Sequence, residues 1–160
     1  MSVIGAGGSG GGFFQDPTTT KVLSRIIVRC GSRVDGIQCV YTDGSMTSSH
    51  GGTGGREEFF NLSPNEAILV NKIYNAIRIF THLSQTVQVW SGSEVDALQF
   101  QTTMGRWSPK YGGSGGAPYI IRGNANQKER ALMGFKGRSG SRIDYLEVFT
   151  STESSSITCY

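Results

Sequence analysis

The sequence predicts an all-β protein in which short strands close around one core, and three features support this. Apolar and polar residues alternate with a period of two along several segments, as in half-buried strands. Turn-forming residues interrupt these segments at close intervals. Glycine accounts for 23 of the 160 residues, where average usage would give roughly 11, and most of the excess falls in motifs that recur three times. We expect residues 1–160 to form a single domain.

Alternation indicates where the strands lie, and we expect about ten to twelve short strands and no helix. The clearest segments are residues 21–29, 37–41, 86–90, 98–101 and 143–149. Residues 71–80 are ambiguous, because their apolar residues also have a helical spacing. A strand there agrees better with the rest of the chain.

Two glycine-containing motifs each occur three times. The first, Gly-Ser-x-x-Asp with a β-branched residue before the aspartate, we call the acidic turn; it occurs at residues 31–35, 92–96 and 140–144. The second, Gly-Gly-x-Gly-Gly, we call the glycine loop; it occurs at residues 7–11, 51–55 and 112–116. Twice, 16 residues separate the aspartate of an acidic turn from the start of the next glycine loop. The third acidic turn lies near the C-terminus, so its partner must be the loop at the N-terminus.

The repeat therefore predicts three similar β units, the last of which is closed by the start of the chain. Such units form a closed prism or barrel of antiparallel sheets, which removes exposed strand edges. Closure also places the N- and C-terminal segments side by side. We name the pairing of turn 140–144 with loop 7–11 site one, that of 31–35 with 51–55 site two, and that of 92–96 with 112–116 site three.

An acidic turn beside a glycine loop has the groups that bind neighbouring sugar hydroxyls. The glycine permits a sharp turn, the next two residues present main-chain N–H groups, and the aspartate follows a β-branched residue that points inward. A hydroxyl can donate to the carboxylate and accept from an amide. For a single copy, a plain turn in which the aspartate caps its own backbone is the simpler interpretation. Triplication of a purely structural turn remains an alternative for all three.

Two segments resemble the signatures of jacalin-related lectins: GFKGRSGSRIDY at residues 134–145 and GGSGGGFFQD at residues 7–16. The similarity extends over essentially the whole chain. It implies a β-prism of three antiparallel Greek-key sheets with pseudo-threefold symmetry, in agreement with the repeat. It also implies that the sugar lies between an acidic turn and the last glycine of a glycine loop.

By this resemblance, the aspartate of each site accepts from two sugar hydroxyls, and main-chain N–H groups of the other residues donate. The implied residues are Gly11, Gly140, Ser141, Arg142 and Asp144 at site one; Gly31, Ser32, Arg33, Asp35 and Gly55 at site two; and Gly92, Ser93, Glu94, Asp96 and Gly116 at site three. A third complete pair departs from the family's commonest plan. Glu94 stands where the other turns have arginine, which changes the rim of site three but not its main-chain donors.

The loops indicate a mannose-type lectin rather than a galactose-type one. Galactose-preferring relatives are cleaved so that the site glycine becomes a free N-terminus, and they carry aromatic residues in the loop. Here ten residues precede Gly11, and the loops hold serine, arginine and glutamate. The expected partners are mannose-containing glycans and glycoproteins, bound without a metal ion or other cofactor. The sequence leaves the oligomeric state open, a homo-oligomer included.

Charge and hydropathy argue against nucleic acids and membranes as partners. The net charge is +3, and the one basic cluster, Lys136, Arg138 and Arg142, is too small for a nucleic-acid surface. The apolar runs are too short to span a bilayer, so we expect no membrane insertion. No signal peptide is visible, which indicates a cytoplasmic or non-classically secreted protein.

The sequence predicts a protein that is not an enzyme. A glycosidase needs two carboxylates about one bond, and only site three has a second acid, Glu94 beside Asp96. A hydrolase is therefore a distant third hypothesis, after a structural or protein-interaction β-prism. His50 and His82 have no ligand pattern around them, and we expect both on the surface or in loops.

The cysteines and tryptophans carry no specific signal. Cys30, Cys39 and Cys159 lack the CxxC spacing of metal or redox sites, and we expect three separate thiols. Pairing of Cys30 with Cys39 across the acidic turn between them is the alternative. Trp90 and Trp107 are expected in packing rather than stacked on a sugar.

Overall fold

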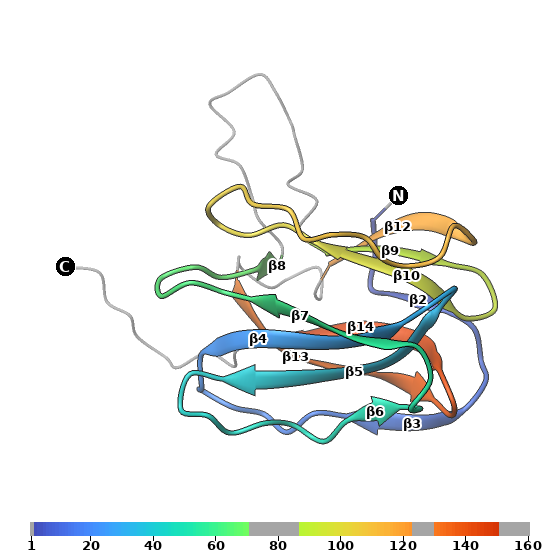
Figure 1. The fold of residues 1–160 in the computed structure, drawn as a ribbon, viewed down its shortest axis with the longest axis horizontal. Coiled ribbons are helices and arrows are strands. Elements are labelled where there is room, and N and C mark those ends of the chain that lie inside the picture. The colour runs from blue at the N-terminus through green and yellow to red at the C-terminus, as the bar shows by residue number, and fades with distance from the viewer. Residues whose placement is uncertain (1, 71–86, 123–129, 151–160) are drawn as a thin grey trace.

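The computed structural model describes residues 2–70, 87–122 and 130–150, and within these ranges the chain forms fourteen strands and no helix (Figure 1). These ranges accordingly contain no helix of the length and apolar character needed to cross a membrane.

The strands form three sheets built on one plan, in which a central hairpin has one outer strand on either side. The first sheet has the order β6-β5-β4-β7, with bounds His50–Gly51, Val34–Tyr41, Leu23–Cys30 and Arg56–Asn61. The second has the order β1-β12-β9-β10-β11, with bounds Ser2–Val3, Ala117–Ile121, Val87–Ser91, Val95–Phe100 and Tyr111–Gly112. The third has the order β2-β14-β13-β3, with bounds Gly5–Gly7, Ile143–Thr150, Arg130–Ser139 and Gly12–Gln15, and β8 (Leu69–Val70) also pairs with β13. The pairing is antiparallel throughout these sheets except between β1 and β12.

The start of the chain completes the third sheet, as the permuted repeat predicts. β2 pairs with β14 and β3 pairs with β13, so the N- and C-terminal parts of the prism lie side by side (Figure 1). The register repeats in all three sheets: the first glycine of each glycine loop lies opposite the residue after a site aspartate, in the pairs Gly7–Tyr145, Gly51–Gly36 and Gly112–Ala97. The expected β-prism with pseudo-threefold symmetry is confirmed.

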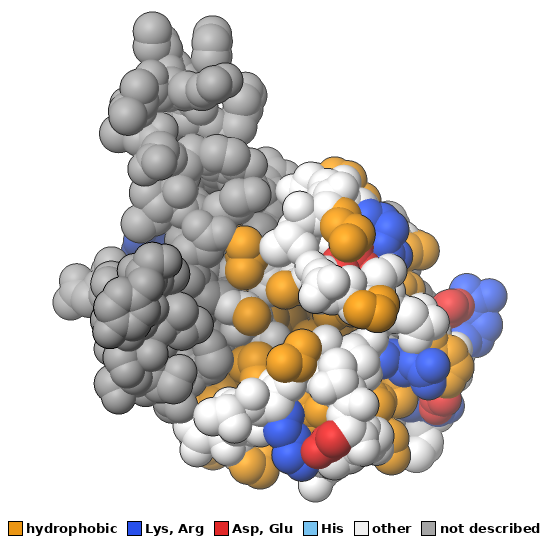
Figure 2. All heavy atoms as spheres, turned by 90° about the vertical axis from the view of Figure 1, so that its left-hand side faces the viewer, with side chains coloured by type: hydrophobic (Ala, Val, Ile, Leu, Met, Phe, Trp, Pro, Cys, Tyr) orange, Lys and Arg blue, Asp and Glu red, His pale blue; other side chains and the backbone are white. Residues whose placement is uncertain are grey.

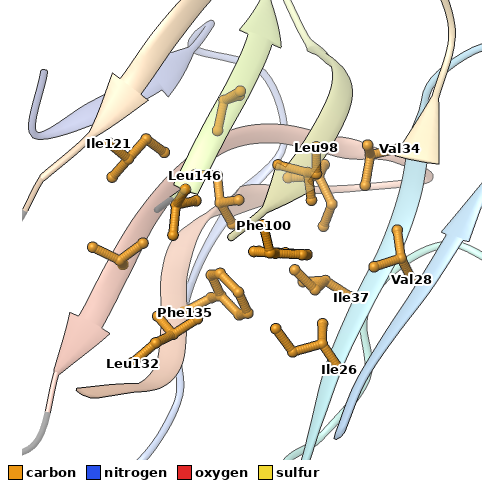
Figure 3. Close-up of a cluster of buried hydrophobic side chains, with 14 of the residues drawn as sticks. Ile26, Val28, Val34, Ile37, Leu98, Phe100, Ile121, Leu132, Phe135 and Leu146 are labelled. Carbon is orange, nitrogen blue, oxygen red and sulfur yellow. The ribbon is translucent and has the colours of Figure 1, made fainter. Parts of the chain in front are cut away.

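Inward-facing side chains of the three sheets form one core. The ring of Phe100 in β10 lies 5.9 Å from that of Phe60 in β7 and 6.4 Å from that of Phe135 in β13, measured between centroids. Each of these rings comes from a different sheet, and aliphatic side chains surround them (Figure 3). Because burying one large apolar side chain contributes about 1.5–3 kcal/mol, this shared core is what holds the sheets together.

The strands expected from alternation are confirmed, with their ends displaced by up to three residues. The expected number of strands was too low, because four of the observed ones are only two residues long and give no periodic signal. Cys30 and Cys39 are buried free thiols, as expected. Residues 71–80, His82 and Cys159 lie outside the described residues.

The end of the prism away from the glycine loops has an apolar hollow of about 200 Å³. Figure 2 looks at this end and shows apolar side chains gathered around the hollow. Leu23 at the start of β4, Leu62 just after β7 and Leu132 in β13 contribute to its lining. A lining of this kind has little to offer sugar hydroxyls, so the polar chemistry predicted from the sequence belongs at the opposite end.

A buried carboxylate, Glu66, ties the loop after β7 to the loop after β10. Its side chain is fully buried and accepts hydrogen bonds from the main-chain N–H of Ser63 (2.9 Å) and the hydroxyl of Thr102 (2.6 Å). Arg106 donates to both carboxylate oxygens, through Nη2 at 2.8 Å and Nε at 3.1 Å. These hydrogen bonds, above all those from Arg106, lower the pKa of Glu66 to about 2.

Glu66→Gln should destabilise the fold in a pH-dependent manner. The ionised carboxylate is favoured in the folded protein, so its contribution of roughly 2–3 kcal/mol is complete above pH 4.5 and is lost as the pH falls toward 2. Urea unfolding between pH 3 and pH 7 measures this, with Glu58→Gln as the control, because Glu58 pairs only with the exposed Arg56. A wild-type advantage over Glu66→Gln that stayed constant with pH would contradict the assignment.

Candidate functional site

The acidic turns and glycine loops gather at one end of the prism, on the right in Figure 1. Each acidic turn joins the two strands of a central hairpin, and each glycine loop joins two outer strands. The turns are closed by equivalent hydrogen bonds from the glycine N–H to the carbonyl two residues on: Gly31 to Arg33 at 3.0 Å, Gly92 to Glu94 at 3.1 Å and Gly140 to Arg142 at 3.0 Å. The β-branched residue that follows is fully buried in every turn, at Val34, Val95 and Ile143. This burial anchors the turn and leaves the next residue, the aspartate, at the surface.

Every site aspartate lies against the glycine loop predicted to be its partner. The last glycine of the loop has a positive φ at each site: 69° at Gly11, 70° at Gly55 and 76° at Gly116. A β-carbon on these glycines would stand 2.5, 2.6 and 2.6 Å from Oδ2 of Asp144, Asp35 and Asp96, well inside van der Waals contact. Glycine is therefore required both for the backbone conformation and for the close approach of the carboxylate.

The second glycine of each loop connects neighbouring sites. A β-carbon there would overlap the main-chain carbonyl of the serine in another site's acidic turn: Gly8 with Ser93, Gly52 with Ser141 and Gly113 with Ser32. Site one thus packs on site three, site three on site two, and site two on site one. The contacts form a closed ring around the pseudo-threefold axis.

Unpaired main-chain donors surround each carboxylate. At site one, the N–H groups of Ser141, Arg142 and Gly11 have no hydrogen-bond partner within residues 2–70, 87–122 and 130–150. The same holds over those ranges for the N–H groups of Ser32, Arg33, Gly55, Ser93, Glu94 and Gly116. The structure thus brings together all the site residues predicted from the sequence, in three separate sets. Each set can accept two hydrogen bonds and donate several, which suits a ligand with adjacent hydroxyls.

Two arginines hold the glycine loops of sites one and two, and the sequence analysis missed both. Arg138 donates from Nε to the carbonyl of Gly10 (3.1 Å) and from Nη2 to that of Gly11 (2.8 Å). Arg29 donates to the carbonyls of Gly54 (3.3 Å) and Thr53 (2.9 Å). Both arginines stand two residues before the glycine of an acidic turn, and this shared offset was the available signal.

Site three differs from the other two at this position. The equivalent residue is Trp90, which cannot donate two hydrogen bonds to a loop. Its ring instead lies 4.0 Å from the ammonium group of Lys110, measured to the ring centroid. The glycine loop of site three therefore lacks the arginine contacts that fix the other two loops.

The third residues of the acidic turns meet in a charged cluster. Nη1 of Arg33 lies 2.9 Å from Oε2 of Glu94, and Nη1 of Arg142 lies 3.2 Å from the same oxygen. Burial alone raises the pKa of Glu94, but hydrogen bonds from Arg142 and Arg33 outweigh it, so this pKa lies below its ordinary value of 4.5. Glu94 is thus a charged partner for two other sites rather than only a changed rim residue.

The expectation for His50 was wrong. His50 begins the second glycine loop in β6, and its side chain is only 12% exposed because it stacks on Phe14, with ring centroids 4.1 Å apart. Its Nε2 pairs with the buried carboxylate of Asp16, which also accepts a hydrogen bond from the N–H of Phe135 (2.8 Å). The pair joins the first and third sheets, and such a contact between distant segments leaves no pattern in the sequence.

Metal-binding geometry is not evident in the part of the chain that the structure describes. No group of three or more His, Cys, Asp or Glu side chains there could hold an ion. The binding chemistry of each site therefore consists of one carboxylate and main-chain N–H groups.

The chain matches the jacalin-like lectin domain over residues 4–149. Jacalin-related lectin 9 of Arabidopsis thaliana is 31% identical over 150 residues, which are 91% of this chain and 44% of that protein. Myrosinase-binding protein 2 of the same plant is 30% identical over 143 residues, which are 88% of this chain and 19% of that protein. The chain thus spans less than half the length of these relatives.

Solved structures of lectins share the fold. Malaysian banana lectin has a TM-score of 0.69 and 22% identity, with 96% of this chain and 99% of that chain covered. A mannose-binding jacalin-related lectin from Ananas comosus has a TM-score of 0.67 and 22% identity, with 92% and 94% covered. Artocarpin, solved as a complex with mannotriose, has a TM-score of 0.70 and 19% identity, with 95% and 97% covered.

The family match over most of the chain agrees with the threefold arrangement of sheets, acidic turns and glycine loops. The protein belongs to the jacalin-like lectin family.

Proposed function

We propose that the protein is a lectin that binds mannose-containing glycans at up to three sites, without a metal ion and without catalysing a reaction. The observation that carries the proposal is the same at each site: an aspartate carboxylate lies beside main-chain N–H groups that have no partner in the described ranges. Buried or half-buried donors without partners are costly, and a sugar hydroxyl that donates to the carboxylate can accept from them.

Two observations favour mannose over galactose. Ten residues precede Gly11, and seven of the last eight of these, residues 3–10, lie in or between β1, β2 and the glycine loop, so the site-one loop is continuous with paired strands. The loops carry no aromatic side chain. Lectins with the same fold from Ananas comosus and Champedak are mannose-binding, and artocarpin was solved with mannotriose.

The alternative is a β-prism with a structural or protein-interaction role and no sugar binding. Its specific support is that Nε of Arg142 lies 3.9 Å from Oδ1 of Asp35, and Nε of Arg33 lies 4.0 Å from Oδ1 of Asp96. Arginines could then neutralise two of the carboxylates without a ligand. A hydrolase that uses Glu94 and Asp96 is disfavoured, because a catalytic acid needs a raised pKa and that of Glu94 is lowered.

A glycan array distinguishes the lectin from the structural alternative. We expect binding to mannosides and high-mannose glycans and none to galactosides. EDTA should not change the pattern, because each site has one carboxylate while Ca²⁺ takes six or more oxygen ligands. Absence of binding to every glycan would favour the structural alternative, and reversible loss in EDTA would contradict metal-independent binding.

Asp144→Ala should weaken binding of methyl mannoside at site one by about 2 kcal/mol, roughly 30-fold. The carboxylate makes charge-assisted hydrogen bonds of about 1.5–3 kcal/mol to the sugar hydroxyls. The fold should persist, because the core residue of this turn is Ile143. Calorimetry measures the affinity, and Asp43→Ala is the control, because it removes an exposed carboxylate in the turn after β5. Unchanged affinity at site one would contradict the role of Asp144.

The three sites together should provide avidity rather than monosaccharide affinity. A shallow site with a few hydrogen bonds should bind methyl mannoside with a Kd of about 1 mM, near −4 kcal/mol. Three such sites at one end of the prism can engage several branches or glycans and gain on the order of 10²–10⁴. The triple variant Asp35→Ala, Asp96→Ala, Asp144→Ala should lose all binding to a high-mannose glycoprotein surface.

The single variants test the number of sites. Each should lose far more avidity for the glycoprotein surface than it loses monosaccharide sites, measured by calorimetry. One sugar per chain in the wild type, unchanged in Asp35→Ala and Asp96→Ala, would contradict the three-site proposal and leave only site one.

A further inference from the structure

One carboxylate lies between two guanidinium groups where the acidic turns meet. Oε2 of Glu94 lies 2.9 Å from Nη1 of Arg33 and 3.2 Å from Nη1 of Arg142. Nη1 of Arg142 also lies 3.3 Å from Oε1 of Glu94. The three side chains are the third residues of three different acidic turns, so this contact exists only because the repeats close on one another. The Glu94 side chain is 23% exposed, less than the 41% and 44% of the two arginines.

Each arginine also faces the sugar-binding carboxylate of a site other than its own. Arg142 belongs to the turn of site one, and its Nε lies 3.9 Å from Oδ1 of Asp35 at site two. Arg33 belongs to the turn of site two, and its Nε lies 4.0 Å from Oδ1 of Asp96 at site three. These distances exceed the 2.7–3.2 Å of an N–H···O hydrogen bond, so both carboxylates keep their acceptor positions.

Site one has no such neighbour. Asp144 makes no ion pair with any Lys, Arg or His in the ranges that the structure describes. Its turn is also the one whose guanidinium, that of Arg142, points to another site. The three sites therefore share their main chain but differ in the charge beside the carboxylate.

We infer that Glu94 is a positioning residue that holds Arg33 and Arg142 away from the carboxylates of sites three and two, and so keeps those two sites open for a sugar. This inference rests on the proposed sugar-binding function. A guanidinium that loses its carboxylate partner pairs with the nearest remaining one, because charge-assisted hydrogen bonds are about twice as strong as neutral ones. The nearest carboxylates here are Asp35 for Arg142 and Asp96 for Arg33.

The inference predicts a different outcome at each site when Glu94 is replaced. In Glu94→Ala, Arg142 should close onto Asp35 and Arg33 onto Asp96, and a sugar must then break a charge-assisted pair in order to bind. We expect affinity for methyl mannoside to fall about tenfold at sites two and three, and to change by less than about twofold at site one. Glu94→Gln, which keeps the size and one acceptor oxygen but not the charge, should lie between Glu94→Ala and the wild type.

Titration of the labelled protein with methyl mannoside, followed by NMR, measures the three sites separately. The main-chain N–H groups of Ser141, Ser32 and Ser93 report sites one, two and three. Glu58→Ala is the matched control, because it also removes a partly exposed glutamate paired with an arginine, Arg56. Thermal unfolding of every variant shows whether the fold is kept.

Second substitutions separate this role from a structural one. Glu94→Ala with Arg142→Ala should restore site two, and Glu94→Ala with Arg33→Ala should restore site three, since each removes the competing cation. Support for the inference is loss at sites two and three with recovery of the matching site in each double variant. Equal affinity at all three sites in Glu94→Ala would overturn it while leaving the proposed function intact. An equal loss at all three sites without recovery in the double variants would assign Glu94 a structural role and also overturn it. A wild-type protein without any mannoside shift would instead refute the proposed function.

Discussion

The second glycine of every glycine loop packs against a main-chain carbonyl in the acidic turn of another site, and the binding end of the prism depends on these three contacts. No side chain fits at Gly8, Gly52 or Gly113. The turns and loops bury few apolar groups of their own, apart from the one β-branched residue per turn that reaches the core. They are held in place because each site supports the next. A carboxylate can then lie beside main-chain N–H groups without a cofactor to organise them.

The same backbone at three places does not make three identical sites. Arg138 and Arg29 fix the glycine loops of sites one and two, whereas Trp90 stands at the equivalent position of site three. Arginines lie beside Asp35 and Asp96 but not, within the described ranges, beside Asp144. Site one therefore combines a fixed loop with an unobstructed carboxylate, and we expect it to bind monosaccharides most tightly.

The sequence predicted the parts of the structure that are local or repeated. Alternation located the main strands because one face of each is buried, and the repeat predicted both the closure by the N-terminal strands and the pairing of turns with loops. Contacts between different repeats could not be predicted, because they depend on the approach of segments far apart in the chain. The pairing of His50 with Asp16 and the cluster around Glu94 are of this kind. Arg29 and Arg138 lie between these cases, since their shared offset from the acidic turn is visible in the sequence but their role is not.

The most direct test of the account is a crystal structure of the protein soaked with methyl mannoside at a saturating concentration. The account predicts one sugar at each of the three sites, with adjacent hydroxyls donating to Asp144, Asp35 or Asp96 and accepting from the N–H groups of the acidic turn and of the last glycine. A sugar bound elsewhere on the prism, with these carboxylates and N–H groups unoccupied, would contradict it.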